Sequence, residues 1–445
     1  MLKFDNNFIF GVSTSSYQIE GAWNEDGRTP SIWDDFCHKE GNVENGDTGD
    51  IACDHYHKYE EDVELLKELG ISSYRFSVAW PRIFPKKGEY NEKGMKFYVN
   101  LINKLKEANI EPAITLYHWD MPMWAHEEGG WTNRESVDWF LEYAKKCFEI
   151  LGDKVKIWIT HNEPFCASFL GYHIGIHAPG IKDLEKAVIA SHHMLLSHGK
   201  AVKLFKEMKM NGDIGITINL EHIEPYTSSF NDLIASSNFD GYLNRWFLDP
   251  LFKGIYPLDI VKLYRNEIRD FSFVRDGDLE IISNDMDFLG INYYTSKVVK
   301  YNLYNELLQF EEVEQDRRKT DMNWAITPEK FKDLVYRIRD EYTNLPIYIT
   351  ENGAAYNDEL TSDNKVHDNK RLEYINDHLE VVSELNQEGM NINGYYLWSF
   401  MDNFEWSFGY SRRLGIVYID YNTLKRIKKD SFYWYQNLIN QVNLP

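Results

Sequence analysis

The sequence predicts an α/β protein built as a single (β/α)8 TIM barrel with long loops between strands and helices. Eight short apolar runs alternate with amphipathic stretches along the 445 residues, which is the pattern of βα units. Several runs are apolar without interruption, as expected for parallel strands covered on both faces. No linker or internal repeat divides the chain. Eight strands with intervening helices close most naturally as a barrel, so residues 1–445 are expected to form one domain.

The expected strands follow the apolar runs. We place them at residues 8–12, 73–78, 112–116, 155–160, 214–218, 288–291, 347–350 and 394–398. An open doubly wound sheet is the alternative, but such a sheet usually has a glycine-rich phosphate loop after an early strand, and this chain has none. A minimal barrel needs about 250 residues. The remaining residues are expected in long loops at 18–59, 117–132, 163–183 and 297–327.

Two of the expected helices lie in the first third of the chain. Residues 60–69 carry apolar side chains at three-residue spacing, and Gly70 favours a left-handed cap at their end. Thr132 and Glu135 have the spacing of a capping box ahead of the next helix.

Two further helices are expected in the last third. The segment Thr-Pro-Glu at 327–329 places proline at the first helical position and an acid in the first turn. Asp368 is a candidate cap for the helix that runs to Gly389.

The composition excludes several classes of function. A formal net charge of −22 disfavours nucleic acid as a partner, because its phosphates would be repelled. The first residues lack the apolar stretch of a signal peptide, and no window has about 18 uninterrupted apolar residues, so no membrane role is expected. The four cysteines have no metal or redox spacing and are interpreted as reduced thiols of a cytoplasmic protein. The basic segment 425–429 is interpreted as the solvated start of a helix.

No metal and no cofactor are expected. The pairs His55 with His57 and His192 with His193 lack the spacing of a helical zinc site and are interpreted as structural. The segment Asp-Gly-Asp at 276–278 is typical of a turn rather than of a calcium loop.

Polar side chains follow directly after four of the expected strands. Folding alone does not require polar residues there. The carboxyl ends of barrel strands form the face that carries the active site, so such residues indicate an enzyme site. They are His118, Trp119, Asp120, His161, Asn162, Glu163, Asn292, Tyr293, Tyr294, Glu351 and Asn352.

Two glutamates among these residues suggest a carboxylate pair that acts on one bond. Glu163 follows the fourth expected strand and Glu351 the seventh. Glycoside hydrolysis with retention uses a carboxylate nucleophile and a protonated carboxyl about 5 Å apart, whereas a separation of about 9 Å is the inverting geometry. One glutamate must stay ionised and the other protonated, so their surroundings must differ. Arg75, in the second expected strand, is a candidate for holding one of them charged.

Eight ordered motifs extend along the whole chain. They are Phe-Gly-Val-Ser-Thr-Ser-Ser-Tyr-Gln-Ile-Glu-Gly at 10–21, Tyr-Arg-Phe-Ser-Val-Ala-Trp at 74–80, Tyr-His-Trp-Asp at 117–120, Asn-Glu-Pro at 162–164, Asn-Tyr-Tyr at 292–294, Ile-Thr-Glu-Asn-Gly at 349–353, Trp-Ser at 398–399 and Asn-Phe-Glu-Trp at 403–406. Through these motifs the chain resembles glycoside hydrolase family 1, the β-glucosidase family.

The resemblance implies a role for each matching residue. Glu351 matches the nucleophile and Glu163 the acid/base residue, while Arg75, Asn292 and Tyr294 match residues that flank and orient the nucleophile. The implied substrate-binding residues are Gln18, His118, Trp119, Asn162, Glu405 and Trp406 around the non-reducing sugar, Trp398 as the platform beneath it, and Trp324 at the aglycone site. Such side chains supply paired donors and acceptors for hydroxyls and faces for stacking on a pyranose. Asn162 is a candidate for the 2-hydroxyl, whose contact strengthens in the transition state.

The resemblance also implies the reaction and the substrate. The expected enzyme hydrolyses terminal β-D-glucosyl residues of cellobiose, short cello-oligosaccharides and aryl β-glucosides, and also takes β-galactosides, through a covalent intermediate. A 6-phospho-β-glycosidase is the alternative, although the Glu405 carboxylate would repel a phosphate. Arg412 and Arg413 lie nearby in the sequence and are interpreted as an exposed turn. Leu414 stands where many family members have Phe, so the resemblance does not define this part of the sugar-binding rim.

A third hypothesis is a sugar-binding or sensor protein with a hydrolase fold. Such a protein would tolerate the loss of one glutamate, and both are present here, which favours the enzyme. His173 and His177 flank Gly175 and either line the site entrance or pack within their loop. Aglycone length, the preference between glucosides and galactosides, and the oligomeric state are not determined by the sequence.

Overall fold

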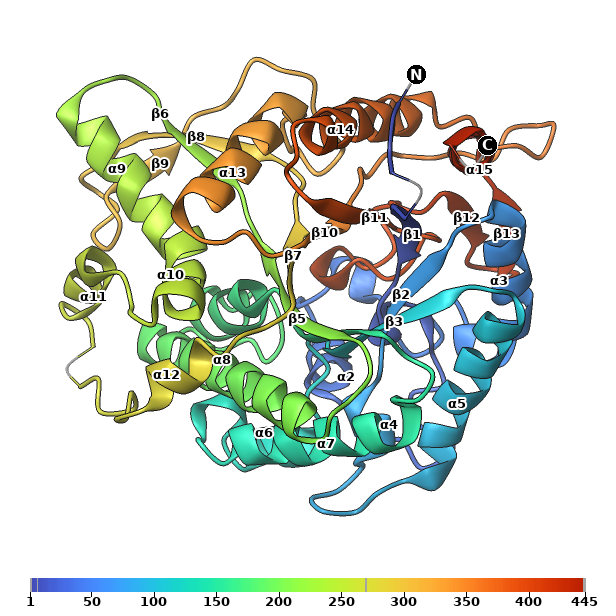
Figure 1. The fold of residues 1–445 in the computed structure, drawn as a ribbon, viewed down its shortest axis with the longest axis horizontal. Helices are drawn as coiled ribbons and strands as arrows, with labels where there is room; N and C mark the ends of the chain where they lie inside the picture. The colour runs from blue at the N-terminus through green and yellow to red at the C-terminus, as the bar shows by residue number, and fades with distance from the viewer. Residues whose placement is uncertain (1, 6, 269, 443–445) are drawn as a thin grey trace.

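A computed structural model describes residues 2–5, 7–268 and 270–442 of the chain. Eight parallel strands form a closed barrel around the centre of the molecule, which confirms the predicted fold class (Figure 1). Around the barrel their order is β1, β11, β10, β7, β5, β4, β3 and β2. The strands are β1 (Ile9–Ser13), β2 (Ser73–Ser77), β3 (Glu111–Tyr117), β4 (Ile157–Asn162), β5 (Asp213–Asn219), β7 (Phe288–Asn292), β10 (Ile347–Asn352) and β11 (Ile392–Trp398).

Helices surround the barrel and cover its outer face (Figure 1). The longer ones are α3 (His55–Leu69), α5 (Glu92–Glu107), α7 (Ser136–Leu151), α8 (Leu184–Glu207), α13 (Pro328–Glu341), α14 (Asn369–Gln387) and α15 (Asp430–Val442). Between β5 and β7 the chain forms α9 (Phe230–Asp240), α10 (Trp246–Lys253), α11 (Leu258–Tyr264) and α12 (Asp278–Ile282). Helix α5 shows the common pattern, since it buries Tyr98, Leu101 and Leu105 at helical spacing.

The long loops contain more regular structure than the sequence predicts. The expected loops 18–59 and 117–132 contain all or part of three short helices: α1 (Ser16–Ile19), α2 (Ile32–Cys37) and α6 (Met123–Glu127). A fourth short helix, α4 (Trp80–Ile83), follows β2. The expected loop 297–327 contributes strands β8 (Ser296–Tyr301) and β9 (Phe310–Glu312), which form a small sheet with β6 (His222–Pro225). Helix α9 packs on this sheet at one edge of the molecule (Figure 1). A hairpin of β12 (Val417–Asp420) and β13 (Lys425–Lys428) precedes α15.

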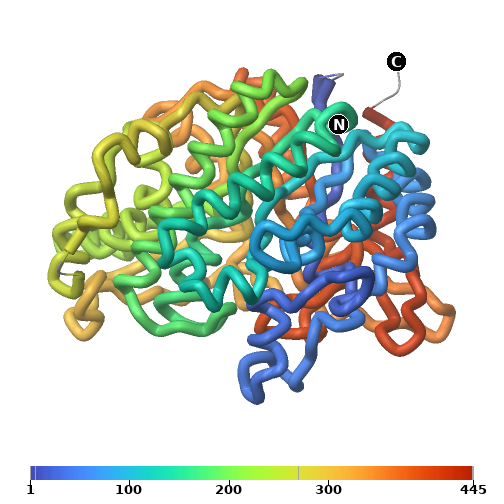
Figure 2. The backbone as a smooth tube through the Cα atoms, turned by 90° about the horizontal axis from the view of Figure 1, so that it is seen from below, coloured from blue at the N-terminus to red at the C-terminus, as the bar shows by residue number. Residues whose placement is uncertain are grey.

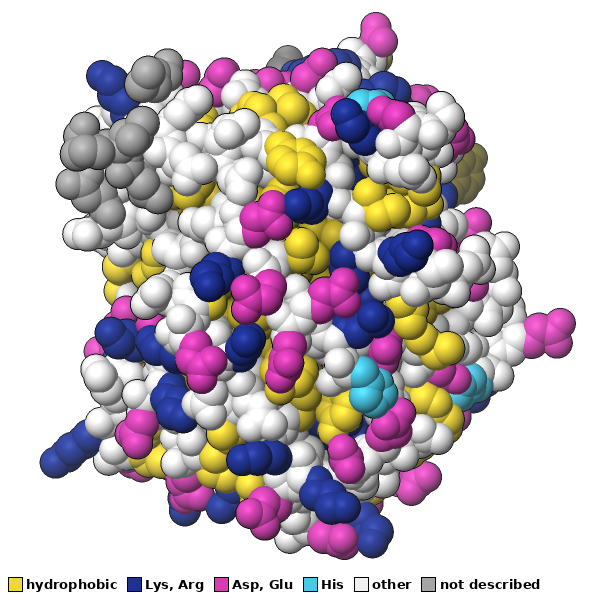
Figure 3. Space-filling model, turned by 90° about the vertical axis from the view of Figure 1, so that its right-hand side faces the viewer, with side chains coloured by type: hydrophobic (Ala, Val, Ile, Leu, Met, Phe, Trp, Pro, Cys, Tyr) yellow, Lys and Arg dark blue, Asp and Glu magenta, His cyan; other side chains and the backbone are white. Residues whose placement is uncertain are grey.

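The long loops and the chain ends lie at opposite ends of the barrel. Figure 2 shows both termini at one end, while the loop that contains α2 projects from the other. On the face drawn in Figure 3, acidic and basic side chains of the described residues are interspersed. None of the helices in the described part of the chain combines the length and apolar character that a membrane span requires.

The helix signals in the first third of the chain are partly right. Helix α3 begins at His55, before the predicted 60–69, and ends at Gly70, whose φ of 81° confirms the left-handed cap. The capping box predicted from Thr132 and Glu135 is wrong, because α7 begins only at Ser136. The Thr132 hydroxyl instead donates to the carbonyl of Gly129 within a preceding turn.

The helix signals in the last third place both starts correctly. Helix α13 begins at Pro328, as predicted. Helix α14 begins directly after Asp368, but the Asp368 carboxylate does not cap it. That carboxylate accepts from Arg371 at 2.5 Å and from the Ser431 hydroxyl at 2.6 Å, because a buried guanidinium competes for it more strongly than a backbone N–H.

The histidine pairs contact acidic or aromatic neighbours. His55 Nδ1 lies 2.7 Å from Asp62, and both side chains are buried. His192 contacts the Tyr256 hydroxyl at 2.9 Å and Asp278 at 3.0 Å. These contacts match the structural interpretation of both pairs.

The prediction that segment 425–429 is a solvated helix start is wrong. Residues 425–428 form strand β13, and the Arg426 guanidinium donates to both oxygens of buried Asp62, at 2.8 and 3.0 Å. Lys429 is fully buried and bonds to Asp402 at 2.7 Å and to Asp358. Buried aspartates on distant loops need these cations as counterions. The ion pairs join the loops after β10 and β11 to the C-terminal helix.

Replacing Lys429 tests this buried ion network. We expect K429M to lower the free energy of unfolding by about 3 kcal/mol, because it leaves Asp402 and Asp358 with an unbalanced buried charge. The matched control is K428M, which removes a surface pair with Glu68 and should cost less than about 1 kcal/mol. Urea unfolding of both variants measures the difference. Equal losses in the two variants would contradict the role of the buried network.

Candidate active site

The predicted site residues gather at the carboxyl ends of the barrel strands, as expected. Arg75 lies in β2, His118 follows β3, Asn162 ends β4 and Glu163 follows it, Asn292 ends β7, Glu351 lies in β10 and Trp398 ends β11. Most of these side chains are buried, while Tyr294, Trp324 and Glu405 are partly exposed. The site therefore opens where the long loops project.

The fully buried guanidinium of Arg75 lies at the centre of the site. Its Nη1 donates to Glu351 Oε1 at 2.7 Å and to the Thr350 carbonyl at 3.0 Å. Its Nη2 donates to Asn162 Oδ1 at 2.7 Å, and its Nε to the Thr115 hydroxyl at 3.1 Å. A guanidinium only donates, so each of these partner atoms must act as an acceptor.

Glu351 is the carboxylate that bonds to a cation. Besides the Arg75 contact, its Oε2 accepts from the Tyr294 hydroxyl at 2.8 Å. Burial raises the pKa of the Glu351 carboxyl, and the charge and hydrogen bonds of Arg75 oppose that rise. The ionised form of Glu351 thus has two direct donors.

Glu163 has different surroundings, as the carboxylate pair requires. Its Oε1 accepts from the neutral amide of Asn292 at 2.6 Å. Burial, followed by the charge of Glu351, raises the pKa of Glu163 to about 7, and bonds from Asn292 and Cys166 oppose the rise. Cys166 was not predicted as a site residue. Its position three residues after Glu163, at the start of the π-helix Cys166–Ile174, is the signal that could have found it.

The amide of Asn292 bonds Glu163 and affects the pKa of both carboxyl groups. Its Nδ2 donates to Glu163 and, at 3.1 Å, to Asn162 Oδ1. Hydrogen bonding from Asn292 also lowers the pKa of both Glu163 and Glu351 against the effect of burial. The orientation of one amide group therefore affects the pKa of both carboxyl groups.

The two strands that carry the glutamates are irregular at the site. The register of β4 against β5 shifts between Ile159 and Asn162, and β10 shifts against both neighbours before Glu351. β-Bulges of this kind commonly re-aim side chains next to active sites. In β10 the bulge lets Thr350 and Glu351 both point into the barrel, although consecutive residues of a regular strand face opposite sides.

Three predicted site residues have positive φ angles. The values are 46° for Glu163, 78° for Trp119 and 48° for Trp406. Residues other than glycine rarely adopt this conformation, and strain of this kind concentrates at functional sites.

Hydrogen-bond directions determine what Gln18 and His118 can offer a ligand. Gln18 Nε2 donates to Asn403 at 3.0 Å and to the Phe404 carbonyl at 2.8 Å, which leaves lone-pair capacity on its Oε1. His118 Nε2 lies 3.2 Å from Asn162 Nδ2, an amide donor. Burial holds the pKa of His118 well below its usual range, so the neutral ring accepts through Nε2 and carries its proton on Nδ1. That Nδ1 is buried and unpaired among the described residues, so it can donate to a ligand.

Glu405 provides a further unpaired group in the site. Its Oε2 is buried and has no hydrogen-bond partner in the described structure. Burial, followed by the charges of Glu351 and Glu163, raises the pKa of Glu405 to about 8. Buried polar atoms normally have partners, so these unpaired atoms indicate a place for a ligand hydroxyl.

Aromatic rings form one wall of the site. Trp119 and Trp406 pack with their ring centroids 4.4 Å apart, and the Trp119 indole N–H donates to the Asn162 carbonyl. His118 stacks 5.8 Å from Trp398 and 5.9 Å from Trp406.

Three aromatic residues outside the predicted set support this wall. Trp33 packs 4.6 Å from Trp406, and Tyr17 stacks on Trp406 at 6.2 Å. His177 packs 5.2 Å from Trp119, which places it beside the site. Tyr17 lies within the motif at 10–21 and His177 in the loop after Glu163, whereas Trp33 had no sequence signal.

The remaining predicted residues lie at the rim. Trp324 packs 5.2 Å from Tyr294, the residue that bonds Glu351, and makes no hydrogen bond to the carboxylates. Leu414 is buried in a small apolar cluster with Trp398 and Ala355. The interpretation of Arg412 and Arg413 as an exposed turn is wrong, because both are partly buried and Arg413 bonds Asp402 at 2.6 Å.

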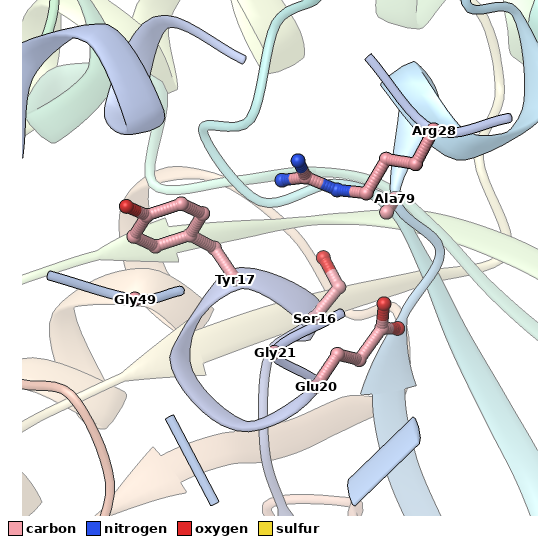
Figure 4. Close-up of a pocket in the computed structure, with 7 residues that line it drawn as sticks. All are labelled: Ser16, Tyr17, Glu20, Gly21, Arg28, Gly49 and Ala79. Carbon is pink, nitrogen blue, oxygen red and sulfur yellow. The ribbon is translucent and has the colours of Figure 1, made fainter. Parts of the chain in front are cut away.

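Hydrogen bonds of Ser16 hold helix α1, the short helix that carries Gln18. The Ser16 hydroxyl donates to Asp120 at 2.9 Å, and the Ser16 N–H to the Ser77 hydroxyl at 2.7 Å. Burial raises the pKa of Asp120 to about 7. Figure 4 shows Ser16, with Glu20 and Arg28, around a small cavity of ≈ 10 Å³ beneath this helix. A cavity of that size accommodates about one water molecule.

The closed parallel barrel and its pair of glutamates at strand ends define a barrel glycosidase. The chain matches the model of Glycosyl hydrolase family 1 over residues 2–443. It is 60% identical to a β-glucosidase from Exiguobacterium marinum whose crystal structure superposes with a TM-score of 0.98, with 100% of both chains covered. It is 48% identical to β-glucosidase A of Acetivibrio thermocellus over 98% of each chain. A 6-phospho-β-galactosidase of Clostridium acetobutylicum is more distant, at 41% identity over 100% of this chain and 98% of that protein.

The chain therefore belongs to glycosyl hydrolase family 1, which confirms the resemblance seen in its motifs. It is a glycosidase of the β-glucosidase type.

Replacing Arg75 tests the geometry of the site. We expect R75K to lower kcat/KM for an aryl β-glucoside by about 100-fold, because one ammonium group cannot hold Glu351 and Asn162 together at their present positions. The matched control is R134K, which alters a two-bond pair with Asp278 away from the strand ends. Steady-state kinetics and thermal melts of both variants separate activity from folding. Unchanged kcat/KM in a folded R75K would contradict the central role of the guanidinium.

Proposed function

We propose that this enzyme is a retaining β-glucosidase in which Glu351 is the nucleophile and Glu163 the acid/base residue. The observation that carries the proposal is the unequal environment of the two carboxyl groups. Glu351 bonds to the guanidinium of Arg75, whereas Glu163 bonds to a neutral amide and has a pKa of about 7. A pair of coupled carboxyl groups that share one proton will hold it on the group without the cation.

The first step forms a covalent intermediate. An oxygen of Glu351 attacks the anomeric carbon, and the bond from that carbon to the leaving oxygen breaks. The proton on Glu163 moves to the leaving oxygen, so Glu163 becomes a carboxylate. Tyr294 and Arg75 hold the Glu351 carboxylate in place for the attack.

The second step releases the sugar. The Glu163 carboxylate takes a proton from a water molecule, whose oxygen attacks the anomeric carbon from the side that the aglycone has left. The bond to Glu351 breaks, so both residues return to their starting forms. Two inversions give net retention, which needs a carboxyl separation of about 5 Å. Asn292 bonds Glu163, and Arg75 bonds both Glu351 and Asn162, the residue before Glu163, so the two carboxyl groups belong to one hydrogen-bonded cluster, which supports a short separation.

The proposed roles predict how kcat/KM depends on pH. Glu351 must be deprotonated, so activity rises with pH through the pKa of Glu351. Glu163 must be protonated, so activity falls as the pH rises through about 7.

The unpaired polar atoms of the pocket support a glucosyl unit as its ligand. Gln18 Oε1 can accept, His118 Nδ1 can donate, and the free Glu405 oxygen can bond a neighbouring hydroxyl. Asn162 retains one amide hydrogen for the 2-hydroxyl. Trp398 would lie beneath the sugar and Trp119 and Trp406 beside it, with Trp324 at the aglycone. Cellobiose, short cello-oligosaccharides and aryl β-glucosides are the proposed substrates, with β-galactosides as further substrates.

We extend the proposal to the setting of the enzyme. Residues 1–445 are proposed to act as one catalytic domain. A location in the cytoplasm is supported by four buried cysteines that remain free thiols. A role in the last steps of cellulose degradation follows from cellobiose as the proposed substrate. No nucleic acid partner is proposed, given the net charge of −22. The oligomeric state is left open.

Azide rescue tests the two catalytic roles. We expect E351G to lose hydrolysis of an aryl β-glucoside and to form the α-glycosyl azide when azide is added, because azide attacks from the vacated nucleophile side. We expect E163G to form the β-glycosyl azide instead, because azide then attacks the covalent intermediate on Glu351. In E163G, kcat/KM for substrates with poor leaving groups should fall at least about 100-fold. NMR of the products gives their configuration, and the same anomer from both variants would overturn the assignment.

A comparison of plain and phosphorylated substrates tests the alternative function, a 6-phospho-β-glycosidase. We expect kcat/KM for 4-nitrophenyl β-glucoside to exceed that for its 6-phosphate, because the unpaired Glu405 oxygen suits a hydroxyl and Arg413 is already paired with Asp402. A preference for the 6-phosphate would instead identify a 6-phospho-β-glycosidase.

A further inference from the structure

A row of hydroxyl groups crosses the barrel interior beneath the carboxylates. Thr217 of β5 donates through its Oγ1 to Thr350 Oγ1 of β10 at 3.2 Å. The Thr350 hydroxyl donates to Asn292 Oδ1 of β7 at 2.7 Å. Asn292 then donates through Nδ2 to Glu163 at 2.6 Å. All four side chains are buried, so water does not compete for these bonds.

The direction of this row follows from the charge of Arg75. Arg75 donates to Asn162 Oδ1, so the neighbouring Asn292 must present its Nδ2, and not its oxygen, to that atom. The oxygen of Asn292 therefore faces Thr350, which has to donate to it. The lone pairs of Thr350 are then left to accept from Thr217.

The row of hydroxyl groups can pass over the inner face of β7 because that strand has a glycine, Gly290, at this point. Gly290 pairs with Thr217 in the barrel register. A Cβ atom on Gly290 would lie 2.3 Å from Thr217 Oγ1 and 3.0 Å from the Thr350 side chain. The bulge in β10 turns Thr350 inward toward the same space. The backbone carbonyl of Thr217 also accepts from the N–H of Glu163 at 2.9 Å.

We propose that Thr350 and Thr217 are positioning residues that lock the Asn292 amide with its N–H groups toward Glu163 and Asn162. Thr350 acts directly on the amide, and Thr217 keeps the Thr350 hydroxyl directed toward it. Without this lock the amide can turn over and present its oxygen to Glu163 and Asn162, which are acceptors. The inference deepens the proposed function and rests on the roles given there to Glu163 and Glu351.

A turned or mobile amide has a defined effect on the acid/base chemistry. At present the bonds from Asn292 lower the pKa of both Glu163 and Glu351. Their loss raises both pKa values, so the acid and alkaline limbs of kcat/KM both move to higher pH. The other ionisable groups that face the two carboxyl groups are Arg75, Tyr294, Glu405 and Cys166. The variants below leave all four in place.

The experiment compares pH profiles of three valine variants, which keep the shape of threonine and remove its hydroxyl. We expect T350V to move both limbs upward by up to about one pH unit, the effect of one hydrogen bond to a charged group. We expect a smaller upward shift in T217V, because Thr350 can still donate to Asn292. The matched control is T160V, which removes a buried barrel hydroxyl that contacts His198 on the outer side of β4. It should leave both limbs in place.

Two further variants keep the test decisive. T350S retains the hydroxyl and should restore the limbs of the parent enzyme. In an N292A background, T350V should cause no further shift, because the two residues act through one contact. Limbs that stay in place in folded T350V, or that move equally in T160V, would overturn the proposal.

Different results would show that the proposed function itself is wrong. E163G would then retain the alkaline limb with activated aryl glucosides, and the azide products would not differ between the glutamate variants. If T350V fails to fold, the proposal is tested by the pH profiles of T217V and T350S. The N292A double-mutant comparison is then made with T217V instead of T350V.

Discussion

The charge of Arg75 is the constraint on which the rest of the site depends. A guanidinium cannot accept a hydrogen bond, so its contacts impose a direction on every neighbouring group. Asn162 must turn its oxygen toward Arg75 and its nitrogen toward His118, which places the His118 proton on the side of the pocket. Asn292 must likewise turn its nitrogen toward Glu163. One buried cation thus distinguishes the two glutamates and also orients the groups that contact the sugar.

Much of the fold and most of the site could be predicted from the sequence, because these features have local or motif-level signals. Buried parallel strands appear as apolar runs, and polar residues at their ends have few structural reasons to be there. Glu163, Glu351 and Arg75 were found in this way, and the structure brings Arg75 and Glu351 into contact. His118, Trp119 and Asn162 were found in the same way. The other binding residues came from the resemblance to the family, which no physical rule would have supplied.

The features that escaped prediction depend on partners distant in the chain. Thr132 has the spacing of a capping box, but the helix begins later, and Asp368 is held by Arg371 rather than by the helix N-terminus. Lys429 looks like a surface residue until the aspartates of two other loops are placed around it. Thr217 has no signal at all, since its role depends on a glycine in the neighbouring strand. Hydrogen-bond direction is likewise a property of the assembled network and not of any segment.

The bulge in β10 has a consequence for how such a site can change during evolution. It adds Thr350 to β10 relative to β7, and the side chains of Thr350 and Glu351 both point into the barrel. Deleting Thr350 would restore even pairing with β7 and leave Glu351 opposite Asn292, still directed inward. A loss of one codon would thus keep the glutamate and remove the hydroxyl that donates to the Asn292 oxygen. The orientation of a side-chain amide in this barrel is encoded by the length of a strand as well as by the identity of its residues.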